Sequence, residues 1–254
     1  MSFRNANYSI NRVGGFGDGH KSGQSIFEES STPTTYIGDK VELSDGRVFR
    51  YGYTAGAINR GLLVSQDVSA TAIVESDGKL TAASAGATEV TYTDSGTVGS
   101  ATADQYAGGY LHITDDAGEG HQYRIKSNTA ADSNAVTFTL YDPVAVALTT
   151  ASDVAVTGSL WYNVVAATAG TDYIMAGVTP ISFTANYYGW FQTAGVATIL
   201  SDTAIAIGDN LTLSDGVAGA VQLKDAETEP LVGFACFAPD DGGHVGVVLQ
   251  GLVA

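Results

Sequence analysis

The chain of 254 residues is long enough for one large domain or two ordinary ones, and its 27 acidic against 11 basic side chains give a net charge of −16. A surface this negative repels phosphate backbones, which argues against direct nucleic-acid binding. The polar start MSFRNANYS argues against a signal peptide, and the lack of a long apolar run argues against a membrane span. Plentiful Gly, Ala, Ser and Thr favour strands and turns over helices.

Residues 1–36 are a polar string in which apolar side chains recur at no fixed period. Such a segment cannot fold by itself, so it is either a mobile tail or an arm that becomes ordered on a neighbouring protein, and its spaced anchors favour an extended arm. The side chains expected to dock are Phe3, Arg4, Tyr8, Ile10, Arg12, Phe16 and Phe27. The glycine-rich run 14–23 does not match a phosphate-binding loop, because His20 separates Gly19 from Lys21.

Residues 37–105 are interpreted as an N-terminal β region. Alternation predicts strands over 40–43 and 47–53 around an Asp45-Gly46 turn, then an apolar run over 57–64 leading to 70–74. A turn is expected at 76–78, and a further strand over 89–92.

Residues 106–150 predict a three-stranded meander that could be an insertion. Within it, apolar side chains alternate along 110–113, along 122–125 after an acidic turn, and along 134–141. The side chains expected on the buried face are Leu111, Ile113, Tyr123, Ile125, Val136, Phe138 and Leu140.

Residues 151–254 are interpreted as a C-terminal β domain. Strands are expected at 181–183, 188–193, 196–199, 210–213, 220–223, 232–238 and 244–250. Cys236, the single cysteine, lies in an apolar run and is expected to be buried. Short strands at this spacing predict an all-β protein, an antiparallel sandwich or barrel-like body that carries the N-terminal arm.

A faint internal echo links the two ends of the body. An aromatic strand followed by Ala-Ile-x-x-Gly occurs at 48–61 and again at 189–208. Coincidence and duplication both remain open. A true duplication would place the two strands in related or mutually packed units, with the meander inserted between them.

The polar residues show no pattern of a catalytic or metal site. The histidines lack ligand spacing, and His112 and His121 are interpreted as an exposed pair across a hairpin. Asp115, Asp116 and Glu119 do not match a calcium loop, and no Gly-x-Ser-x-Gly motif is present. We therefore expect no enzyme activity and no metal or cofactor.

Four neighbouring aromatic residues, Tyr187, Tyr188, Trp190 and Phe191, form the densest apolar cluster of the chain. Alternation would direct Tyr188 and Trp190 to one face and Tyr187 and Phe191 to the other, so at least one pair is expected in the core. The other pair is expected at a self-interface, with a sugar platform as the alternative.

Three stretches resemble structural proteins of tailed bacteriophages. The run 177–213 contains an aromatic Gly-Trp strand, a short hairpin and an Ile-x-x-Gly-Asp turn, 40–64 resembles the opening of such proteins, and 118–128 with 140–143 resembles their middle. Together they are similar to capsid decoration, or cement, proteins, and they follow in the expected order over about half of the chain.

The resemblance implies a structural virion protein without catalytic residues. Such a protein would be made in the host cytoplasm and would stabilise the capsid by binding the outside of the major capsid protein shell. It would also contact copies of itself, most plausibly as trimers. The alternative function is a glycan-binding adhesin or a fibre or tail module on a phage or bacterial surface.

Overall fold

The computed structural model describes residues 24–67, 74–93, 97–168, 174–238 and 243–250. The prediction of an all-β protein with barrel-like sheets is confirmed: the described residues form sixteen strands, one 3₁₀ turn (η1, Thr97–Ser100) and no α-helix. Of the expected arm, 1–23 lies outside the described residues.

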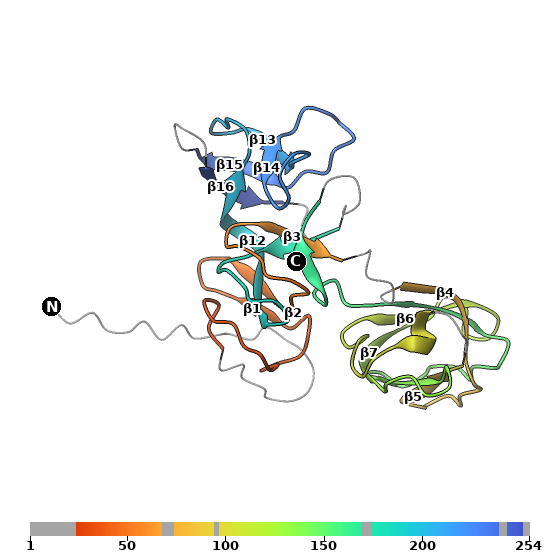
Figure 1. Cartoon of the computed structure of the whole chain (residues 1–254). Helices are drawn as coiled ribbons and strands as arrows, with labels where there is room; N and C mark the ends of the chain where they lie inside the picture. Colours follow the sequence, from red (N-terminus) through yellow and green to blue (C-terminus); the bar gives the residue numbers. More distant parts are fainter. Residues whose placement is uncertain (1–23, 68–73, 94–96, 169–173, 239–242, 251–254) are drawn as a thin grey trace. The chain divides into compact units, whose positions relative to one another are not determined.

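The chain divides into two compact units (Figure 1). Unit 1 combines 1–67 with 163–254, and unit 2 is the continuous segment 68–162. The sequence interpretation drew its boundaries after residues 36, 105 and 150, so the inserted segment is longer at both ends than the meander expected at 106–150. The extra length supplies strands to a sheet that the meander alone would leave open.

Unit 1 is built around one long strand, β12 (Tyr188–Ser201). Its first half pairs with β2 and β11, and its second half pairs with β16. The other strands of unit 1 are β1 (Lys40–Glu42), β2 (Val48–Tyr53), β3 (Leu63–Gln66), β10 (Val164–Ala166), β11 (Met175–Val178), β13 (Asn210–Leu213), β14 (Val221–Leu223), β15 (Gly233–Phe237) and β16 (Gly243–Leu249).

The second half of β12 closes a small barrel. The ring runs β12–β16–β15–β13–β14 and returns to β12 through the parallel pair Ser201↔Val221. Closure leaves no unpaired sheet edge in this part of the unit. The barrel interior is filled by buried aliphatic side chains, among them Ile199, Leu211, Val221, Val232, Val245 and Val247.

The expected hairpin between 188–193 and 196–199 is wrong, because β12 continues through both segments. Gly195 has a φ of 85°, and the register against β2 shifts between Gln192 and Ala194. The Gln192 side chain donates hydrogen bonds to the carbonyls of Ala194 (3.0 Å) and Val196 (2.9 Å). A bulge of this kind bends a strand without ending it, which lets β12 pass from one set of partners to the next.

The contact expected from the internal echo is present. The first half of β12 pairs antiparallel with β2, and Trp190 lies opposite Tyr51. Mutual packing of the two strands is thus observed, whereas the duplication itself stays a hypothesis.

Unit 2 is a six-stranded antiparallel sheet in the order β4-β9-β6-β7-β8-β5. A bridge between Leu80 and Tyr92 links the end of β4 to β5 and closes the sheet on itself. The strands are β4 (Val74–Lys79), β5 (Glu89–Tyr92), β6 (Tyr110–Asp115), β7 (Gln122–Asn128), β8 (Val136–Leu140) and β9 (Asp153–Thr157). The predicted meander corresponds to β6, β7 and β8.

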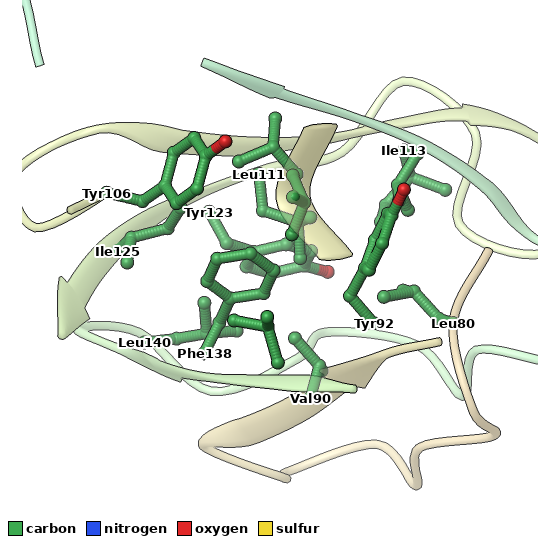
Figure 2. Close-up of a cluster of buried hydrophobic side chains, with 14 of the residues drawn as sticks. Leu80, Val90, Tyr92, Tyr106, Leu111, Ile113, Tyr123, Ile125, Phe138 and Leu140 are labelled. Atoms are coloured by element: carbon green, nitrogen blue, oxygen red, sulfur yellow. The ribbon is translucent and has the colours of Figure 1, made fainter. Parts of the chain in front are cut away.

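Figure 2 shows the interior of unit 2, where side chains from β5, β6, β7 and β8 converge. All seven meander side chains expected to be buried are at most 5% exposed. Tyr106 and Phe138 meet edge to face, with ring centroids 5.9 Å apart. Unit 2 therefore has a hydrophobic core of its own.

Two further local predictions are wrong. Residues 76–78 lie within β4, at a register shift against β9, and do not end the strand. Residues 181–183 form no strand, although Phe183 makes a single bridge to Ile58. The polar residues and glycine at 76–78 and the apolar residues at 181–183 are local signals, whereas the neighbouring strand decides whether a strand continues or forms.

Candidate functional site

The described part of the expected arm is fixed to unit 1. Gln24 is buried, and its amide nitrogen donates to the carbonyls of Glu28 (2.8 Å) and Tyr188 (3.0 Å). Its amide oxygen accepts from Thr34 Oγ1 (2.8 Å) and from the Tyr51 hydroxyl (2.9 Å). Residues 24–34 therefore lie against β2 and β12 and belong to unit 1.

The same segment makes two further contacts with the body. Ser30 and Tyr188 exchange backbone hydrogen bonds of 2.9 and 2.8 Å. The Glu29 carboxylate accepts from the backbone N–H (2.6 Å) and the hydroxyl (2.8 Å) of Thr184. Of the proposed docking side chains, only Phe27 lies in the described region, where it is 59% exposed; Phe3, Arg4, Tyr8, Ile10, Arg12 and Phe16 lie outside it.

The aromatic cluster does not divide by face as alternation predicts. Trp190 and Phe191 are both buried, whereas Tyr187 and Tyr188 are half-buried. Trp190 meets the Tyr51 ring edge to face at 5.1 Å and donates from Nε1 to the Gln24 carbonyl at 3.2 Å. Phe191 stacks on Phe183 at 5.0 Å. Both faces of β12 are covered here, so one member of each expected pair belongs to the core.

Beside β12 lies a pocket of about 370 Å³ with a basic lining. Arg47, Arg60 and His244 contribute to it, and the described residues that line it include no Asp or Glu. The apolar part of the wall comes from Phe27, Val178, Pro180, Val196 and Ala197, and the polar remainder from Gly61, Thr179, Gln192 and Thr198. In a chain with far more acidic than basic residues, this concentration of positive charge is unusual.

Two glycines allow the basic residues to converge. Gly61 has a φ of 72°, and a Cβ on it would lie 2.6 Å from Cδ2 of His244. A Cβ on Gly195 would lie 3.0 Å from Cα of Arg47. Because only glycine fits both the left-handed backbone and these approaches, the two positions set the spacing of the pocket wall.

The charges in the pocket are only partly compensated. Arg47 donates from Nε to Asp45 at 2.8 Å, and hydrogen bonds from its backbone N–H and then its guanidinium lower the pKa of Asp45 below its ordinary value of 3.8. Within the described residues, the guanidinium of exposed Arg60 forms no ion pair and the ring of His244 no hydrogen bond. Asp240 and Asp241, near His244 in the sequence, lie outside the described residues.

The other candidate groups do not form a site. His112 and His121 do not face each other, because His112 pairs with Gln122 while exposed His121 contacts the Gly118 carbonyl at 2.9 Å. The described part of the chain has no group of three or more His, Cys, Asp or Glu side chains that could hold a metal ion. Cys236 is exposed, contrary to the prediction, because β15 turns it to the outer surface of the barrel.

None of the helical structure in the described ranges is long and apolar enough to cross a membrane. Comparison of the chain with protein-family models, with curated proteins and with solved structures finds no match.

Sequence reasoning missed the pocket. Arg47, Arg60 and His244 lie far apart along the chain and share no motif. The positive φ of Gly61 and Gly195, which brings them together, leaves no mark in the sequence beyond the glycines themselves. The one available signal was the clustering of basic residues within 1–60 of an otherwise acidic chain.

Proposed function

We propose that the chain is a structural protein of a tailed bacteriophage that binds the outside of the major capsid protein shell and stabilises it. The proposal includes no enzyme activity and no cofactor. It is supported by the phage-like stretches at 40–64, 118–128 with 140–143, and 177–213, by the all-β fold and by the acidic charge, which suits a protein present at high local density.

The observation that carries the proposal is the anchoring of residues 24–34. Buried Gln24 joins residues 1–23, with their apolar and basic side chains, to a compact acidic body at one defined place. If residues 1–23 bind the capsid in addition to unit 1, each copy makes a second contact, and contacts repeated over many copies raise the overall affinity steeply. Self-association as trimers is part of the proposal, because the resemblance implies it.

The arm is tested by deleting residues 1–23 and measuring occupancy on heads assembled from the major capsid protein. Deleting 1–36 would not separate docking from folding, because it removes Gln24 and Ser30 from the body. We expect the shortened chain to keep its fold and lose most of its occupancy. Phe27→Ser should reduce occupancy less, and Ile207→Ser, a control at a residue 72% exposed, should leave it unchanged. Full occupancy without 1–23 would contradict the docking role.

The alternative function, a glycan-binding adhesin or fibre module, relied on an exposed aromatic platform. Of the four aromatic residues that suggested such a platform, Trp190 and Phe191 are buried, and Tyr187 and Tyr188 are half-buried. This burial weakens the alternative.

A further inference from the structure

The basic pocket beside β12 has the features of a binding site for a carboxylate. Arg60 and His244 line it without an acidic partner among the described residues, and Arg47 adds a second guanidinium, of which only Nε is engaged by Asp45. Arginine is suited to carboxylates because its planar fork can donate two parallel hydrogen bonds. A negative group entering the pocket would therefore relieve a local excess of positive charge.

The pocket also has an apolar side, which narrows the ligand class. Phe27 is 59% exposed and Val196 54% exposed, and both line the pocket together with Pro180. An inorganic anion would leave these apolar side chains exposed to water. An acidic side chain next to an apolar one would cover it and would meet the arginines at the same time.

An apolar strip extends from the pocket across the outer face of the barrel. Val196 on β12 lies opposite Val248 on β16, which lies opposite Phe234 on β15. Phe234 is 36% exposed, and Val248 is partly exposed. A segment seated in the pocket could continue along this row, where cross-strand neighbours offer a continuous surface.

We propose that the pocket of Arg47, Arg60 and His244 binds an acidic segment of a protein partner, which inserts a carboxylate between the basic groups and lays an apolar neighbour against Phe27 and Val196. The chain's own residues 1–23 fit poorly as occupant, because Arg4, Arg12 and Lys21 outnumber Asp18. Nucleic acid fits poorly because the rest of the chain is strongly acidic. The proposal does not depend on the capsid function.

The test uses the full chain and two synthetic peptides, acetyl-Gly-Leu-Glu-Glu-Leu-Gly-amide and its counterpart with Gln in place of Glu. NMR titration should show that the Glu peptide shifts the ring resonances of His244 and binds at least about tenfold more tightly than the Gln peptide, which corresponds to about 1.4 kcal/mol. Equal affinity for the two peptides would overturn the proposal. So would inorganic phosphate that displaces the Glu peptide at equal concentration, because the site would then be a general anion site.

Single substitutions test whether the peptide binds in the pocket. Arg60→Gln and His244→Gln change exposed side chains, so both should fold normally and each should weaken the Glu peptide several-fold. Lys126→Gln is the matched control, an exposed cation in unit 2, and should have no effect. Equal weakening by Lys126→Gln would overturn the proposal. If sedimentation shows self-association that Arg60→Gln abolishes, the acidic segment belongs to a second copy of the chain, in support of the proposal.

Discussion

At the scale of single residues, Gln24 connects the N-terminal segment to the body. Its amide bridges the Glu28 and Tyr188 carbonyls on one side and the Thr34 and Tyr51 hydroxyls on the other. Burial raises the pKa of the Tyr51 hydroxyl, while its hydrogen bonds with Thr34 act in the opposite direction. A buried polar group that loses its hydrogen-bond partners lowers the stability of the fold.

Replacement of Gln24 by Ala should therefore destabilise unit 1. Loss of the amide removes the donor to the Glu28 carbonyl, one of the two donors to the Tyr188 carbonyl, and the acceptor of the Thr34 and Tyr51 hydroxyls. We therefore expect a decrease of about 1–3 kcal/mol in the free energy of unfolding. Urea denaturation measures it. Ser31→Ala, at an exposed position of the same segment, should change stability by less than about 0.5 kcal/mol. An equally small effect of Gln24→Ala would mean that the segment is not anchored as described.

His112 gives unit 2 a defined pH dependence. Burial lowers its pKa below the ordinary value of 6.5, and Nε2 lies 3.1 Å from Thr157 Oγ1. At a pH between the two pKa values of His112, the unfolded chain binds more protons than the folded chain. The stability that neutral, buried His112 contributes above pH 6.5 is therefore lost as the pH falls through the folded pKa. Between pH 7.5 and 5, the melting temperature should fall less in His112→Gln than in the parent chain. Parallel pH profiles would contradict this assignment.

At the scale of elements, β12 depends on a glycine at its bend. Gly195 combines a φ of 85° with an approach that would bring a Cβ within 3.0 Å of the Arg47 backbone. The strand can thus change partners from β2 to β16 without a break.

Gly195→Ala should cost more stability than Gly46→Ala. Both glycines have positive φ, but a Cβ on Gly46 would meet nothing within 4 Å, so Gly46→Ala measures backbone strain alone, about 1–2 kcal/mol. The additional close contact at Gly195 should add about 1–3 kcal/mol. Chemical denaturation of the two variants gives the comparison. Equal losses would show that the backbones of β12 and the 45–47 turn are not so close.

Strand positions could be predicted from the sequence where apolar side chains alternate. Tyr110–Asp115, Gln122–Asn128 and Val136–Leu140 bury one face each, so their period is visible without knowledge of the fold. β12 was divided in two because a glycine in a strand has the same local signature at a turn and at a bulge. Only the partner strands decide between them, and these are supplied by distant parts of the chain.

The pocket, too, could not be predicted from the local sequence. His244 and Arg60 line the same pocket because the backbone N–H of Leu200 on β12 donates to the Gly61 carbonyl at 2.7 Å and Leu200 pairs with His244 in the barrel. Neither contact is encoded near either residue. The docking role of the side chains in 1–23 rests on local composition alone and remains a prediction.

At the scale of the whole molecule, the two units have separate cores. β4 and β9, at the two ends of unit 2, pair antiparallel at Val74↔Thr157, so the chain enters and leaves this unit from neighbouring strands. This arrangement allows unit 2 to be an insertion that folds around its own hydrophobic interior.

Calorimetry should therefore resolve two unfolding transitions. Phe138→Ala removes a fully buried ring from unit 2 and should lower the free energy of unfolding of that unit by about 3–5 kcal/mol. Phe191→Ala should lower the free energy of unfolding of unit 1 by a similar amount. A single transition lowered by both substitutions would show that the units unfold together.

The proposed capsid function is tested most directly by co-sedimentation. The purified chain of residues 1–254 is mixed with empty phage heads that lack it, and the bound fraction is measured at increasing protein concentration. We predict saturable binding at a fixed ratio to the major capsid protein, with the added protein on the outer surface in electron micrographs. Protein that stays in the supernatant at every concentration, or that binds without saturation, would contradict the proposal.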